Sequence, residues 1–168
     1  MAADPIVASL PVDSLVLLIG PSGSGKSTWA AARFRADVVL SSDALREQVA
    51  GDAADQAATA DAFKVLHVIT KARLRRGLLT VVDATNLTEG ARRSLLRLAG
   101  KAERPVVAVA FDVELERCLA QNLARPGRRV PEAVVRRHHQ QMQGALERLP
   151  REGYQAVHLV REEAMDGA

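Results

Sequence analysis

The chain has 168 residues, of which 48% are apolar and 26% charged, and this composition is typical of one globular domain. Only 3% are aromatic, which disfavours a protein that reads single-stranded nucleic acid mainly by stacking bases on rings. The formal net charge of +3 permits phosphate-rich partners. No apolar run reaches the roughly 18 residues of a membrane span. The single cysteine, Cys118, suits a reducing compartment, so a cytoplasmic protein is expected.

Five short runs rich in apolar residues predict the strands of a sheet. They lie at residues 15–19, 38–40, 78–82, 106–111 and 157–160. Leu15–Ile19 is apolar throughout, which is typical of a strand buried on both faces of a parallel sheet. Residues 1–13, which precede it, are expected to form a loose lead-in.

Helices are expected between these strands, at residues 26–35, 44–49, 55–76, 89–99, 115–124 and 132–149. Gly77 and Thr88 suit the end of one helix and the N-cap of the next, and Pro131 suits a first turn. Because strands and helices alternate, right-handed crossovers would place helices on both faces of a five-stranded parallel sheet. We therefore expect a single α/β domain over residues 1–168.

A phosphate-binding motif decides the class of this domain. Residues 20–27 match G-x-x-x-x-G-K-[ST] at every fixed position, after a predicted strand and before a predicted helix. The glycines let successive backbone N–H groups point at phosphate oxygens, and the helix dipole adds positive potential. Lys26 would reach the β- and γ-phosphates of ATP or another nucleoside triphosphate, and the Ser27 hydroxyl would bind Mg²⁺. The expected nucleotide-binding residues are Gly20, Pro21, Ser22, Gly23, Ser24, Gly25, Lys26, Ser27 and Thr28.

Asp43 and Arg46 follow the second predicted strand, at the sheet edge where ligands bind in open α/β folds. Asp43 could accept a proton from an attacking hydroxyl, or it could cap the helix that follows. Arg46 could hold the acceptor or a neighbouring phosphate by a forked contact. Both residues are candidate catalytic groups.

Asp83 follows the third predicted strand and has the position of a Walker-B-type carboxylate. It could orient Mg²⁺, directly or through water, or support the loop structurally. Thr85 and Asn86 come next and would either line an acceptor pocket or form a turn.

Arginines surround a Pro-Gly break between two predicted helices, at Arg125, Arg128 and Arg129. This combination predicts a lid over residues 125–131 whose guanidiniums close over a transferring phosphoryl group. The alternative is a solvated basic turn. Arg125 and Arg129 are the candidate catalytic arginines, and Arg117 on the preceding helix is a further one.

Other conspicuous residues are expected to have ordinary roles. Trp29 is interpreted as core, and Cys118 as a small helix residue. His138 and His139 are interpreted as surface or packing residues, because neighbours on a helix cannot face the same way.

These segments together resemble the P-loop kinases that phosphorylate polynucleotide 5′-hydroxyl groups. The matching segments are Gly20–Thr28, Ser42–Arg46, Val82–Asn86 and the lid with its helix. The resemblance implies the P-loop NTPase fold with a five-stranded parallel sheet and an arginine-bearing lid. It also implies transfer of the ATP γ-phosphoryl group, with Asp43 as the base and Arg46 near an acceptor phosphate. Arg125 or Arg129 would contact the donor phosphates.

Three functions remain open from the sequence. The first is a kinase whose acceptor is the 5′-hydroxyl of a nucleic acid. The second is a kinase for a small molecule such as a sugar, a nucleoside or an antibiotic, because the same loop and base would serve it. The third is a nucleotide-dependent switch that transfers nothing to a hydroxyl group.

Overall fold

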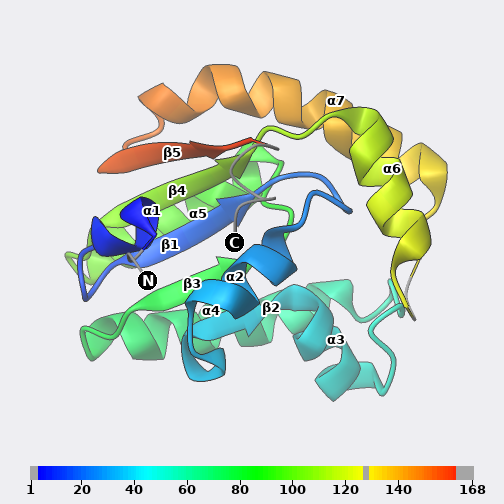
Figure 1. The fold of residues 1–168 in the computed structure, drawn as a ribbon. Coiled ribbons are helices and arrows are strands. Elements are labelled where there is room, and N and C mark those ends of the chain that lie inside the picture. Colours follow the sequence, from blue (N-terminus) through cyan, green and yellow to red (C-terminus); the bar gives the residue numbers. More distant parts are fainter. Residues whose placement is uncertain (1–3, 127–128, 162–168) are drawn as a thin grey trace.

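A five-stranded parallel sheet forms the centre of the computed structural model, which describes residues 4–126 and 129–161. The strands are β1 (Leu15–Ile19), β2 (Val39–Ser41), β3 (Thr80–Asp83), β4 (Val106–Phe111) and β5 (Ala156–Val160). Their order across the sheet is β2-β3-β1-β4-β5, and every neighbouring pair is parallel. Figure 1 shows β1 near the middle of the sheet. The predicted sheet is confirmed.

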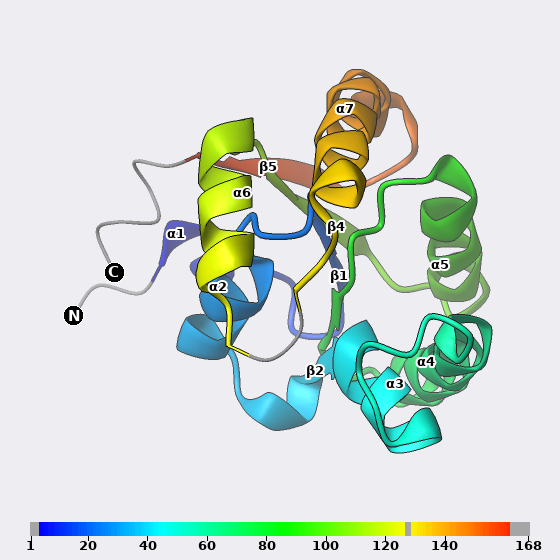
Figure 2. The same ribbon diagram turned by 90° about the vertical axis from the view of Figure 1, so that its right-hand side faces the viewer.

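Helices cover both faces of this sheet. They are α1 (Pro5–Ala8), α2 (Lys26–Arg33), α3 (Ser42–Ala50), α4 (Thr59–Arg75), α5 (Glu89–Lys101), α6 (Leu115–Ala124) and α7 (Glu132–Arg148), with short 3₁₀ turns at Ala36–Val38 and Leu149–Arg151. Figure 2 shows α4 and α5 on one side of the sheet and α2 and α6 on the other.

Alternate side chains of β1 supply the two halves of the core. Leu15 and Leu17 pack in the cluster that includes α4 and α5, whereas Val16 and Leu18 pack in the cluster that includes α2 and α6. All four are fully buried. This two-sided burial explains why the strand carries no polar alternation. Packing on both faces also holds β1 in place, and the phosphate-binding motif begins directly after its last residue.

Departures from the expected structure at two places have identifiable reasons. The helix predicted from residue 55 begins only at Thr59, because Asp52 and Asp55 accept hydrogen bonds from the backbone N–H groups two residues on. Such local bonds compete with helix formation. The expected loose lead-in is wrong for residues 4–10: Asp4 caps α1 and pairs with Arg33 at 2.6 Å. Residues 1–3 lie outside the described part.

No helix within residues 4–126 and 129–161 is both long and apolar enough to cross a membrane.

Candidate active site

A cleft of about 1090 Å³ opens at the carboxyl ends of β1, β2 and β3. One side is the P-loop wall, which we define as residues 20–28 with α6 and the first half of α7. The other side is the α3–α4 wall, defined as α3, residues 51–58 and the first two turns of α4. The sequence-predicted residues that line the cleft are Ser22, Gly23, Gly25, Lys26, Ser27, Thr28, Asp43, Arg46, Asp83, Thr85, Arg117, Arg125 and Arg129.

The P-loop backbone takes a shape that depends on glycine. Gly23 and Gly25 have φ values of +80° and +86°, which L side chains rarely adopt. A Cβ atom on Gly23 would lie 2.1 Å from the carbonyl oxygen of Cys118 on α6. The loop therefore packs directly against the helix that leads into the predicted lid. Cys118 and Trp29 are both buried, as expected.

Lys26 folds back over the loop. Its Nζ atom donates to the carbonyl oxygens of Gly20 at 2.9 Å and Pro21 at 2.7 Å. The side chain is buried, and this burial lowers the pKa of Lys26 to about 8, although the carboxylate of Asp83 acts in the opposite direction. Gly20 and Pro21 thus serve through their carbonyl groups and do not themselves line the cleft.

Ser27 and Asp83 form a pair of oxygen donors beside Lys26. The Ser27 hydroxyl donates to Oδ2 of Asp83 at 2.6 Å, and Asp83, the last residue of β3, is buried. Hydroxyl and carboxylate oxygens are the donors that Mg²⁺ prefers. No group of three or more acidic, His or Cys side chains that could hold a metal occurs in the described ranges. The pair therefore fits Mg²⁺ that shares its coordination with nucleotide phosphates and water.

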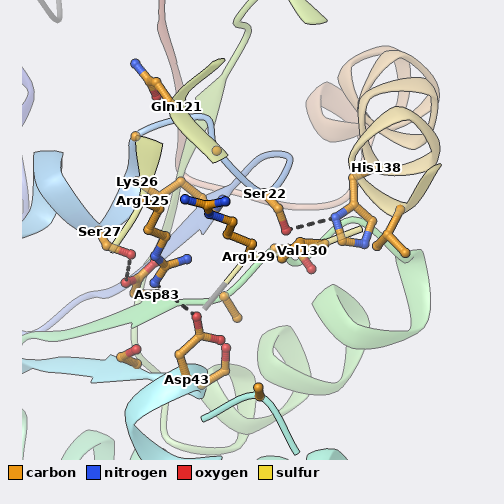
Figure 3. Close-up of a pocket in the computed structure, with 18 of the residues that line it drawn as sticks. Ser22, Lys26, Ser27, Asp43, Asp83, Gln121, Arg125, Arg129, Val130 and His138 are labelled. Carbon is orange, nitrogen blue, oxygen red and sulfur yellow. Dashed lines mark hydrogen bonds and ion pairs between the residues drawn. The ribbon is translucent and has the colours of Figure 1, made fainter. Parts of the chain in front are cut away.

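Asp43 lies across the cleft from this pair, near the start of α3 (Figure 3). The residue that caps α3 is Ser41, whose hydroxyl accepts from the N–H of Ala44, so the N-cap alternative for Asp43 is wrong. The Asp43 carboxylate instead pairs with Arg46 through one oxygen and with Arg125 through the other, at 3.3 Å. Two guanidiniums thus hold it in the cleft.

Arg46 is a buried residue of the α3–α4 wall. Its Nε atom donates to the carbonyl oxygen of Ala53 at 3.0 Å while its Nη2 atom contacts Asp43. The side chain therefore joins the loop after α3 to the carboxylate. This geometry makes Arg46 a positioning group for Asp43, in addition to any contact that it makes with a ligand.

One side chain of α6 ties down the C-terminal end of the predicted lid. Asn122 donates to the carbonyl oxygen of Val130 at 2.7 Å and accepts from the Val130 N–H at 3.0 Å. Arg125 and Arg129 lie between Asn122 and Val130 in the chain and line the cleft. Arg128 lies outside the described residues. The sequence does not predict this role of Asn122, because nothing in the local pattern distinguishes it from other polar helix residues.

Thr85 and Asn86 divide between the two roles that the sequence left open. Thr85 lines the cleft, and its carbonyl oxygen accepts from the N–H of Gly20 at 3.0 Å. Asn86 has a φ of +48°, and its side-chain amide donates to the carbonyl oxygen of Leu18 at 2.8 Å. Fully buried Arg92, paired with Glu152 at 2.5 Å, also holds the Asn86 carbonyl. Asn86 is therefore a turn residue, and its bonds to Leu18 and Arg92 hold the backbone next to Thr85 in place.

His138 contributes to the cleft, contrary to its expected role as a surface or packing residue. Its Nδ1 atom lies 3.1 Å from the hydroxyl of Ser22 in the P-loop (Figure 3). His139 does not line the cleft. The contact joins residues 116 positions apart, so only the packing of α7 over the loop could reveal it. Other residues that line the cleft include Thr59, Phe63, Gln121 and Arg137.

Known structures share this fold. A chain of the Pnkp1/Rnl/Hen1 RNA repair complex matches with a TM-score of 0.71 and 23% identity, covering 80% of the present chain. The present chain spans only 45% of that chain's length. A putative kinase from Chloroflexus aurantiacus matches with a TM-score of 0.65 and 15% identity over 94% and 92% of the two chains. A gluconokinase from Sinorhizobium meliloti matches with a TM-score of 0.56 and 19% identity over 90% and 84%.

Sequence comparison gives the family. None of the curated proteins matches the chain significantly. The model of a family described as AAA domain matches residues 15–149, which include the P-loop, Asp43, Asp83 and the lid segment. These residues span all but the first and last elements of the fold just described. The chain therefore belongs to this AAA domain family, and it has the fold of P-loop kinases.

Proposed function

We propose that this protein is a kinase that transfers the γ-phosphoryl group of ATP to a hydroxyl acceptor, with Asp43 as the general base. The observation that carries the proposal is the position of Asp43, which faces the cleft opposite Lys26, Ser27 and Asp83. A switch protein that only hydrolyses nucleotide needs a group that orients water. A carboxylate that faces the phosphate-binding groups across a cleft roomy enough for a second substrate favours transfer to an acceptor.

The proposed reaction uses groups from both walls. Asp43 takes the proton of the acceptor hydroxyl as its oxygen forms a bond to the γ-phosphorus, and the bond from that phosphorus to the β,γ-bridging oxygen breaks to release ADP. Lys26 leaves its carbonyl partners for the β- and γ-phosphates. Ser27 and Asp83 would hold Mg²⁺, which neutralises phosphate charge when bound.

Two lid arginines support this arrangement. Arg125 already reaches Asp43, and Arg129 lines the same cleft. In the proposed cycle Arg125 exchanges its contact with the carboxylate for a contact with the transferring phosphoryl group. This exchange frees one oxygen of Asp43 for the acceptor proton and places positive charge where negative charge develops.

The acceptor that we propose first is the 5′-hydroxyl end of a nucleic acid. The arginines in the cleft would suit a phosphate beside that hydroxyl, and the resemblance of Asp43 and Arg46 to the polynucleotide kinase motif supports the same acceptor. The repair complex with the matching fold contains a protein named Pnkp1. A small-molecule acceptor is the second candidate. The residues that line the cleft from the loop after α3 and from α4 are all uncharged, which disfavours an extended phosphate backbone there.

A transfer assay with labelled ATP and Mg²⁺ tests the proposal. We expect label on a 5′-hydroxyl oligonucleotide and none on the same oligonucleotide already carrying a 5′-phosphate. Label on nucleosides or sugars alone would assign the second candidate. Magnesium-dependent ATP binding with no transfer to any hydroxyl would indicate a switch and overturn the kinase proposal.

A further inference from the structure

The α3–α4 wall carries an unexplained group of side chains beside Asp43. Ala54, Gln56, Thr59 and Phe63 all line the cleft, and the proposed phosphoryl transfer uses none of them. Thr59 and Phe63 are four residues apart on α4, so they lie on the same face of the helix. Together they form a short surface next to the proposed base.

Thr59 has an unusual hydroxyl group. Its Oγ1 atom is buried and has no hydrogen-bond partner among the described residues, although the residue lines the cleft. A buried polar atom without a partner is destabilising, so such atoms are rare unless a ligand or water completes them. The hydroxyl therefore has unused hydrogen-bonding capacity, and because Thr59 as a whole is partly exposed in the cleft, a rotation of its side chain would present the hydroxyl to a ligand.

Phe63 supplies the complementary apolar surface. It is the only Phe, Tyr or Trp among the described residues that line the cleft, and it is partly exposed while its other side packs on the core. Because only 3% of the residues are aromatic, few rings are available to line any cleft, and Phe63 is therefore a notable lining residue. A partly exposed ring of this kind suits the face of a planar group.

The charge of the lining residues limits the chemical class of the ligand further. Ala54, Gln56, Thr59 and Phe63, which line this part of the cleft, are all uncharged, so they offer no cation to a phosphate group. An uncharged planar ring with hydrogen-bonding atoms suits this surface, because its face can stack on Phe63, its polar atoms can bond to the Thr59 hydroxyl and it needs no cation.

We propose that Phe63 and Thr59 form a subsite for the base of a nucleoside-type acceptor, whose ring stacks on Phe63 and hydrogen-bonds to the Thr59 hydroxyl. The inference rests on the proposed kinase function, because it assigns the acceptor of the same cleft. The nucleoside has two possible sources, a free nucleoside or nucleotide and the terminal residue of a nucleic acid, and they share the chemistry that this subsite would recognise.

The test compares two acceptors that differ only in the base. One is a nucleoside 3′-phosphate with a free 5′-hydroxyl, and the other is its abasic analogue with the same sugar and phosphate. Binding is measured by calorimetry with a non-hydrolysable ATP analogue and Mg²⁺, and transfer is measured separately with ATP. We expect the base to strengthen binding about 10-fold or more, because stacking on an aromatic ring contributes at that level. A 5′-hydroxyl oligonucleotide in the same assay distinguishes the two sources.

Variants of the subsite should remove this preference without removing the fold. Phe63→Leu keeps an apolar side chain against the core and should weaken binding of the nucleoside about 10-fold, with no change for the abasic analogue. Thr59→Val keeps the shape of the side chain and should weaken nucleoside binding about 3- to 10-fold. Because the Thr59 hydroxyl has no protein partner, the melting temperature of this variant should stay the same or rise. Val68→Ala, on the exposed face of the same helix, serves as the matched control.

The outcomes separate the inference from the kinase function. Equal binding of the base-bearing and abasic acceptors, or equal loss of both in Phe63→Leu, would overturn the subsite while transfer activity persists. Transfer to no acceptor would overturn the kinase function, and the binding comparison would still report on the subsite. A fall in the melting temperature of Thr59→Val would show that the hydroxyl is structural and would contradict the role given to it here.

Discussion

The two walls of the cleft are built by different rules. The P-loop wall is a tightly packed backbone structure in which Gly23 touches the Cys118 carbonyl and Lys26 is buried against loop carbonyls. The α3–α4 wall presents side chains instead: Asp43 between two arginines, a partly exposed Phe63 and an unpartnered Thr59 hydroxyl. A polyphosphate is the same in every nucleoside triphosphate, so a fixed backbone cradle suits it. The acceptor differs from one kinase to another. Side chains on helices suit its recognition, because they can change without altering the sheet.

The sharpest way to break this comparison is to remove the proposed base. Asp43→Asn keeps the size of the side chain and should lower kcat by about 10²- to 10⁴-fold, which is the usual contribution of a general base. The Kd for ATP, measured by calorimetry, should change little because the P-loop wall is intact. Full transfer activity in this variant would show that Asp43 is not the base.

Replacing Gly23 by alanine tests the rigidity of the P-loop wall. The variant should lose about 2–5 kcal/mol of unfolding free energy, because a positive φ and a contact with the Cys118 carbonyl both oppose a Cβ atom. Gly51→Ala is the matched control, with φ of +75° and no atom within 4 Å of the added Cβ, and should lose only about 1–2 kcal/mol. Equal losses in urea titrations would mean that the contact with α6 is unimportant.

The buried lysine predicts a pH dependence that belongs to the P-loop wall alone. With a pKa of about 8, Lys26 loses its proton as the pH rises from 7 to 9. Phosphate binding favours the protonated ammonium group, so ATP affinity should fall roughly tenfold over this range and binding should take up protons. Calorimetry in buffers of different ionisation enthalpy measures both effects. Lys26→Arg, which stays charged, should show a flat profile. Constant affinity of the unaltered protein between pH 7 and 9 would refute the prediction.

The smallest expected effect concerns the contact between Ser22 and His138. Ser22→Ala and His138→Ala should each weaken ATP binding by about 2- to 10-fold, since a single hydrogen bond contributes about 0.5–1.5 kcal/mol. The double variant should lose no more than the larger single loss if the two side chains act as one unit. Additive losses in a titration of ATP affinity would place His138 in a separate role.

The sequence by itself determined the sheet, its parallel topology and the phosphate-binding loop. Periodicity and apolar runs depend on nearby residues, and the loop motif is contiguous, so local pattern was sufficient for Leu15–Ile19 and residues 20–28. It also placed Asp43 and Asp83 at the right sheet edge, because parallel strands end together. The roles proposed for these residues in catalysis remain predictions.

Only the tertiary structure decided which distant side chains meet. The contact of Ser22 with His138, the Asn122 anchor of the lid segment and the close approach of Gly23 to Cys118 all depend on how α6 and α7 pack over the loop. The pairing of Asp43 with Arg125 likewise spans 82 positions. Such contacts arise from packing between elements that are far apart in the chain, and no local pattern of residues encodes them.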